Sequence, residues 1–134
     1  MKFEKFMCDV AKALLKEKPV QFRRCGNDVL ITIDGYFAVI LPQQINIFKC
    51  DLLGDFVIPL DSKEYEIKPL LISEWRNEKL CRVFNNGVWK TCLDERFLRY
   101  FDKNAKFYQV KENSAVFVEE HEKVWGVIMP IYRR

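Results

Sequence analysis

The feature that most limits the folds open to this chain is a series of short apolar runs separated by turn-forming residues. Segments 26–27 (Gly-Asn) and 34–35 (Asp-Gly) separate the first three runs, and segment 85–87 (Asn-Asn-Gly) separates two later ones. Glycine and asparagine adopt positive φ angles at little cost, so such segments join neighbouring antiparallel strands. The pattern therefore predicts two groups of hairpins, with strands at 20–24, 29–33, 36–41, 80–84, 88–92, 106–110, 115–119 and 124–131.

Two helices are expected as well. The apolar residues of segment 3–17 recur with the 3.6-residue period of an amphipathic helix, which would end before Pro19. The residues that carry this period are Phe3, Phe6, Met7, Val10 and Leu14. Asp94 is a suitable N-cap for a second, short helix that extends to Phe101.

The residues between the two groups of strands have a weaker pattern. A helix over 42–53 is expected, because a proline begins this segment and a glycine follows it. Extended segments are expected at 56–60 and 64–72. Each contains a proline, which lacks the backbone N–H of a central strand, so both are expected at sheet edges or in irregular structure.

An internal repeat links the two ends of the chain. Segments 36–42 and 124–130 lie 88 residues apart and share an order of small residue, Val, Ile, Leu or Met, and Pro. Each closes a predicted three-stranded meander that follows a predicted helix. We therefore expect an α+β fold in one domain, residues 1–134, built from two helix-plus-antiparallel-meander halves, roughly 1–60 and 61–134, with the helices on one face of the sheet.

The composition excludes several classes of protein. With 134 residues, of which 49% are apolar, the chain can bury a core of its own. No apolar run approaches the eighteen or so residues of a membrane span, and charges interrupt the apolar residues near the N-terminus as they would not in a signal peptide. The five cysteines lack paired spacing, so we expect reduced, mostly buried thiols and a cytoplasmic location.

No motif for catalysis or cofactor binding is found, so the chain is expected to be non-enzymatic and to need no cofactor or metal. The single histidine, His121, lies in a charged turn where acid–base chemistry is less expected than simple solvation. Cys25 follows Arg23 and Arg24, which would lower its pKa, but no base is near in the sequence. One histidine without closely spaced cysteines argues against a zinc site.

Three segments resemble the last domain of the bacterial DNA polymerase III beta sliding clamps. They are Cys92-Leu-Asp-Glu-Arg-Phe-Leu-Arg-Tyr-Phe, Ser114-Ala-Val-Phe-Val and Val127-Ile-Met-Pro-Ile-Tyr-Arg. The early turn Thr32-Ile-Asp-Gly-Tyr is similar to a clamp turn as well. The resemblance covers residues 80–134 well and 1–42 loosely, and it implies a clamp-like fold, itself a duplicated helix-and-sheet unit.

The chain also departs from the clamp pattern. A bacterial clamp subunit joins three such domains and two subunits close a ring, whereas one domain is expected here. Phe37 stands where clamps usually have arginine, and Tyr132 intervenes before the terminal arginines. Small clamp-like chains of this kind resemble proteins of phages and mobile elements. The resemblance therefore implies an accessory role in DNA replication, with double-stranded DNA, a polymerase or clamp-client peptide, or a second copy of the chain as partner, and neither membrane nor small-molecule substrate.

Two alternatives to that role remain open. The chain could mimic a clamp domain, binding clamp clients or a host clamp without DNA. It could instead be a small structural or regulatory interaction protein that uses neither surface.

Basic residues on the two predicted helices are candidates for contact with DNA. The net charge of +3 permits such contact without requiring it. The resemblance implies that clamp helices face DNA and that their cations meet phosphates without reading sequence. The alternative is an ordinary solvated helix face. The candidates, all on the polar sides of the two helices, are Lys5, Lys12, Lys16, Arg96, Arg99 and Lys103.

The end of the chain is the second candidate site. By the resemblance, Met129, Pro130 and Ile131 match the clamp residues that line a pocket for short peptides of polymerases and other clients. Met and aliphatic side chains suit such a pocket because they adapt to aromatic or leucine anchors. The alternative is that Met129 and Ile131 fill the core beside Trp125.

Trp75 is a third residue of interest because it lies in a polar stretch, residues 73–77. An exposed tryptophan can anchor a partner. The more common arrangement is packing on the edge of its own domain.

Overall fold

The computed structural model describes residues 1–48, 51–58 and 65–131, and the predicted tight turns are present in it. Gly26 and Gly35 have φ angles of 60° and 72° and join the first three strands. These φ values lie in the left-handed region that glycine tolerates. The strands are β1 (Val20–Cys25), β2 (Asp28–Ile33), β3 (Phe37–Leu41), β4 (Glu66–Arg76), β5 (Lys79–Asn85), β6 (Lys90–Asp94), β7 (Lys106–Gln109), β8 (Val116–Glu120) and β9 (Lys123–Ile128).

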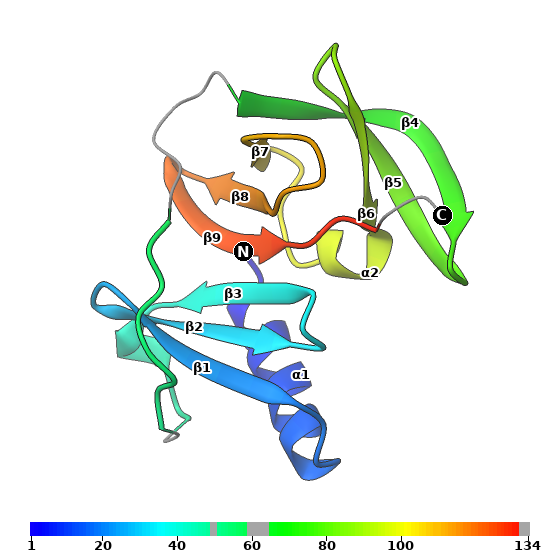
Figure 1. Ribbon diagram of the computed structural model, residues 1–134. Coiled ribbons are helices and arrows are strands. Elements are labelled where there is room, and N and C mark those ends of the chain that lie inside the picture. The colour runs from blue at the N-terminus through cyan, green and yellow to red at the C-terminus, as the bar shows by residue number, and fades with distance from the viewer. Residues whose placement is uncertain (49–50, 59–64, 132–134) are drawn as a thin grey trace.

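The nine strands form one sheet, and every pair of neighbouring strands is antiparallel. The order is β1-β2-β3-β9-β8-β7-β4-β5-β6. In Figure 1 the β1–β3 meander and the β4–β6 strands lie at opposite ends, with β8 and β9 between them. With few helices beside this sheet, the chain has the expected α+β architecture.

The pairing of β3 with β9 agrees with the 88-residue repeat. Ala38 pairs with Val127, and Val39 pairs with Gly126. The two repeated segments thus pair with each other and run antiparallel, so a local two-fold axis relates the third strands of the two meanders.

The first helix, α1 (Phe3–Leu15), forms where its apolar period predicts. Phe6 and Val10 are fully buried, whereas Leu14 at the end of the same stripe is partly exposed. The helix ends two residues earlier than expected, because Glu17 adopts a φ of 55° and the N–H of Lys18 bonds to the carbonyl of Ala13. This is the left-handed type of C-terminal cap.

The second helix, α2 (Glu95–Leu98), is shorter than predicted. Asp94 caps it as expected, since its carboxylate accepts a 2.9 Å hydrogen bond from the N–H of Arg96. The segment that was expected to continue the helix to Phe101 is a tight turn instead. The N–H of Phe101 bonds to the carbonyl of Leu98, three residues back, and the Tyr100 carbonyl accepts a bond from the N–H of Lys2.

The predicted helix over 42–53 is wrong. One 3₁₀ turn, η1 (Gln43–Ile45), is present, and residues 49–50 lie outside the described residues. Residues 53–56 run along the outer edge of β1, where backbone bonds join Leu53 to Phe22 and both Gly54 and Phe56 to Arg24. These long-range backbone hydrogen bonds to the edge of β1 take the place of the local bonds that a helix would form.

The expected extended segments are corrected in a similar way. Residues 56–58 form no regular strand, and 59–64 lie outside the described residues. The expected strand at 64–72 continues to Arg76 as β4, because its second half pairs with β5. Pro69 lies beyond the two residues of β4 that pair with β7, next to a β-bulge, as a proline in a sheet requires.

Two later strand boundaries also shift. The expected strand at 88–92 is β6, which begins at Lys90 because the side-chain oxygen of Asn86 accepts bonds from the N–H groups of Val88 and Trp89. The expected strand at 124–131 ends at Ile128. Beyond it, the N–H of Ile131 bonds to the carbonyl of Cys92 in β6.

Candidate functional site

A groove between α1 and α2 brings together basic residues that are far apart in the sequence. Its volume is about 210 Å³. The four cations predicted from the two helices that line it are Lys12, Lys16, Arg96 and Arg99. Lys18 lines it too, and two carboxylates, Asp9 and Asp34, are the acidic residues of its wall. Five cations against two carboxylates give the groove a positive balance.

The other two predicted cations lie outside this groove. Lys103 lines a neighbouring cavity of about 340 Å³, to which Arg99 also contributes. Lys5 lies on α1 with its Nζ atom 6.0 Å from the centre of the Tyr100 ring. The structure thus brings four of the six candidates around one groove and places Lys103 beside it, while Lys5 is near the lining residue Tyr100 but does not line the groove itself.

Contacts between Asp9 and the residues after α2 hold the two walls of the groove together. The hydroxyl of Tyr100 donates a hydrogen bond to Asp9, and Nη2 of Arg99 lies 3.9 Å from the same carboxylate. Burial, together with the Asp9 carboxylate, raises the pKa of Tyr100 to about 12, so the phenol remains a donor at neutral pH. Arg99 also lies over the Tyr100 ring at 5.5 Å.

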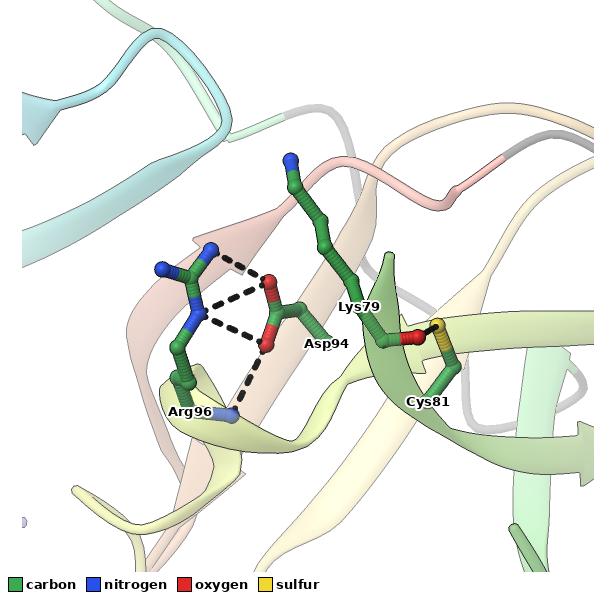
Figure 2. Close-up of polar contacts among 4 residues, drawn as sticks. All are labelled: Lys79, Cys81, Asp94 and Arg96. Atoms are coloured by element: carbon green, nitrogen blue, oxygen red, sulfur yellow. Dashed lines mark hydrogen bonds and ion pairs between the residues drawn. The ribbon is translucent and has the colours of Figure 1, made fainter. Parts of the chain in front are cut away.

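The charge of Arg96 is balanced by Asp94, whereas Lys12 and Lys16 form no ion pair with any residue that the structure describes. Figure 2 shows the Asp94 carboxylate between the Arg96 guanidinium and the side chain of Lys79. Arg96 donates to both carboxylate oxygens, the shortest bond being 2.7 Å. Burial opposes ionisation of Asp94, but the bonds from Arg96 outweigh it and hold the pKa of Asp94 below its ordinary value.

A second candidate site is an apolar cavity of about 320 Å³ that Met129, Pro130 and Ile131 line together. Three bonds position this segment: the N–H of Met129 to the Tyr36 carbonyl, that of Ile131 to Cys92, and Arg76 to the Ile131 carbonyl. Pro130 is buried, while Met129 and Ile131 are half-buried. Ile131 also packs against buried Cys81, Val83 and Cys92, a cluster other than the one that Trp125 packs against.

Sequence reasoning missed other residues that line this cavity, which include Tyr36, Lys79 and Phe97. Tyr36 is 55% exposed, and Nζ of Lys79 lies 5.0 Å from its ring centre. Tyr36 and Met129 also line an adjacent cavity of about 310 Å³, to which Phe56 contributes. The signal that could have marked Tyr36 as exposed is its position directly after the Asp34-Gly35 turn, because turns lie at the surface.

The structure also places the histidine and the cysteines that the sequence analysis discussed. His121 has a φ of 51° and lies exposed in the β8–β9 turn. Burial raises the pKa of the Cys25 thiol, the opposite of the effect predicted for its arginine neighbours. Among the cysteines that the structure describes, Cys81 and Cys92 are buried but Cys8 is exposed, so burial is less general than expected.

Within the described ranges no cluster of three potential metal ligands is present, and none of the helices there has the length and apolar character needed to cross a membrane. Comparison of the chain with protein-family models, curated proteins and solved structures finds no match.

Proposed function

We propose that this chain is a non-enzymatic, sliding-clamp-like accessory protein of phage or mobile-element DNA replication, and that it contacts the DNA backbone through the groove between α1 and α2. The observation that carries the proposal is the meeting of Lys12 and Lys16 with Arg96 and Arg99 around one groove. Cations that neutralise phosphates release counterions, which supplies affinity without any reading of sequence.

The clamp-like fold is part of this proposal. In such a fold both helices cover one face of the sheet. Phe37 of β3 supports this arrangement, since its ring contacts Phe6 of α1 and stacks on Phe97 of α2 at 4.7 Å. The antiparallel pairing of β3 with β9 is a further support, because the equivalent strands of two halves meet there.

Reversing two charges tests the DNA contact. The double variant Lys12→Glu and Arg99→Glu is expected to bind a labelled duplex about tenfold more weakly at low salt. The slope of log affinity against log salt should become less steep by about 2, or roughly 0.9 for each lost phosphate contact. Fluorescence anisotropy over a salt series measures both quantities.

The control carries the same change of net charge elsewhere. Lys68→Glu with Lys90→Glu alters two exposed lysines that do not line the groove. This control should bind nearly as well as the native chain, and thermal unfolding checks that both double variants fold. Equal affinity of the native chain and the groove variant would disprove the contact.

A second candidate function is the binding of a client peptide, which the cavity beside Met129 favours. The cavity combines apolar walls with an exposed tyrosine and a lysine, which suits a peptide with neighbouring Leu and Phe anchors. Such a peptide is expected to slow hydrogen exchange in segment 123–131. A peptide with both anchors replaced by Ser is the control, and unchanged exchange at saturation would exclude this function.

A second copy of the chain could pair with this sheet only at a strand edge whose backbone groups are free. The outer edge of β1 is already bonded to residues 53–56, so a partner strand there would have to displace that segment. If neither DNA nor peptide binds, the remaining proposal is a structural or regulatory interaction protein.

A further inference from the structure

Trp75 is the large aromatic side chain whose surroundings the proposed function does not explain. It is 73% exposed, and it lies in β4 next to the turn that leads into β5. Its cross-strand partner is Leu80, which is itself 38% exposed. Because Trp75 belongs to a paired strand, its direction is set by the backbone. The sequence analysis gave packing on the edge of its own domain as the more common arrangement, but a side chain that is 73% exposed is not packed in this way.

The side of the hairpin on which Trp75 lies follows from strand alternation. Residues two apart in a strand share a face, so Trp75 lies on the side of Ser73. Pairing is regular from Ser73 to Arg76, beyond the bulge. Ser73 Oγ and Arg82 Nε both donate 2.9 Å hydrogen bonds to Glu95 Oε1, at the start of α2. Trp75 therefore faces the α2 side, about 7 Å along the strand from Ser73.

Two cavities near α2 are lined by more cations than carboxylates. The groove between α1 and α2 and the neighbouring cavity share Arg99, and they form one continuous surface that we term the basic face. Among the described residues, seven Lys or Arg side chains and four Asp or Glu side chains line the two cavities. In Figure 1 the end of the β4–β5 hairpin extends beyond α2. Arg82 and Glu95, the contacts of Ser73 on this side of the hairpin, line the second cavity, so Trp75 lies two residues along β4 from the rim of the basic face.

We infer that Trp75 stacks on an unpaired base of a single-stranded nucleic acid whose phosphates lie along the basic face. A flat aromatic ring beside a series of cations is the arrangement that binds single strands without sequence preference, because every base has a stacking surface. A base within a duplex has both of its surfaces covered, so the ring offers a duplex nothing comparable. The excess of cations over carboxylates on the basic face favours a nucleic acid over an apolar protein partner.

This inference rests on the proposed function for the phosphate contacts and adds a preference for strands with unpaired bases, such as those at a primer junction. The phosphate contacts and the base stacking can be tested separately. The charge reversals at Lys12 and Arg99 affect single-stranded and duplex DNA alike, whereas a change at Trp75 affects the single strand alone.

Three variants of the 134-residue chain test the inference. Trp75→Leu keeps an apolar side chain but removes the ring, Trp75→Phe keeps a smaller ring, and Val88→Ala alters an exposed apolar residue in another hairpin. Affinities are measured by anisotropy with a labelled oligodeoxythymidylate and with a blunt duplex of equal length. Tryptophan emission is recorded in the same titrations.

Trp75→Leu is expected to weaken binding of the oligodeoxythymidylate about tenfold and to leave duplex affinity unchanged. Trp75→Phe should retain most of the affinity, and Val88→Ala all of it. The strand should quench tryptophan emission of the native chain but not of Trp75→Leu, which keeps the other two tryptophans. Equal affinity of Trp75→Leu and the native chain for the strand, or an equal loss for strand and duplex, would overturn the inference.

Discussion

Replacing Phe37 with alanine is expected to lower the free energy of unfolding by about 3–5 kcal/mol, the range for a large aromatic side chain removed from a packed core. Phe37 is 1% exposed and lies in β3 between the two helical segments. Its ring meets the edge of Phe6 and of Phe101 and stacks on Phe97 and Tyr100. Alanine would leave a cavity that four aromatic rings border, and their rigid shapes limit its collapse.

Urea denaturation followed by circular dichroism measures this effect. Phe37→Leu should lose less stability than Phe37→Ala, because leucine fills part of the cavity. Phe56→Ala is the matched control, since Phe56 is half-buried and packs against the small cluster around Leu30 and Ala38. If Phe37→Ala and Phe56→Ala unfold at the same urea concentration, then Phe37 does not hold the helices to the sheet.

Replacing Glu120 with alanine should destabilise the fold by a comparable amount, about 3–5 kcal/mol, because it leaves a buried charge without its partner. The α-ammonium group of Met1 pairs with the Glu120 carboxylate, and both residues' side chains are almost completely buried. The other carboxylate oxygen accepts a 3.0 Å bond from the N–H of Asp102. Glu120 therefore joins β8 to the beginning of α1 and to the turn after α2.

Chemical denaturation of two further variants distinguishes the contribution of the Glu120 charge to stability from that of its side-chain packing. Glu120→Gln keeps the length and an acceptor oxygen, so it should lose less stability than Glu120→Ala. Glu112→Ala changes an exposed glutamate of the β7–β8 loop and should stay within about 0.5 kcal/mol of the native chain. A loss for Glu120→Ala no larger than that of Glu112→Ala would show that the Met1 ammonium finds another partner, with Asp102 at 3.7 Å the nearest candidate.

The hairpins were predicted well because their signals are local. Asp34-Gly35 and Asn86-Gly87 adopt their turns through φ preferences and side-chain bonds within a few residues. The Asp94 cap and the apolar stripe of α1 are local in the same sense.

The middle of the chain was predicted poorly because its backbone bonds are not local. The polar groups of residues 53–56 bond to Phe22 and Arg24, which are about thirty residues away in the sequence. A proline before the segment and a glycine after it are compatible with a helix, but they say nothing about a strand edge that needs partners. The short α2 has a similar cause, since the Tyr100 carbonyl bonds to Lys2.

For the basic groove, too, local features were predictable from the sequence and long-range contacts were not. Helical periodicity predicted that Lys12, Lys16, Arg96 and Arg99 point away from the apolar stripes, and all four are exposed. That the two helices face each other across a groove depends on the bonds of Asp9 with Tyr100 and on the rings around Phe37. Neither interaction has a signature in the spacing of residues within one segment.

Turn residues, capping residues and apolar periods thus encode which segments become most of the strands and helices, whereas the pairing of β3 with β9 is seen only in the folded chain. Long-range packing decided the rest: β4 lies beside β7, Tyr36 and Met129 line one cavity, and Trp75 lies on the α2 side of the β4–β5 hairpin. The physical reason is the range of the forces involved. Backbone preferences act over a few residues, whereas burial and hydrogen bonding are satisfied only by the folded chain as a whole.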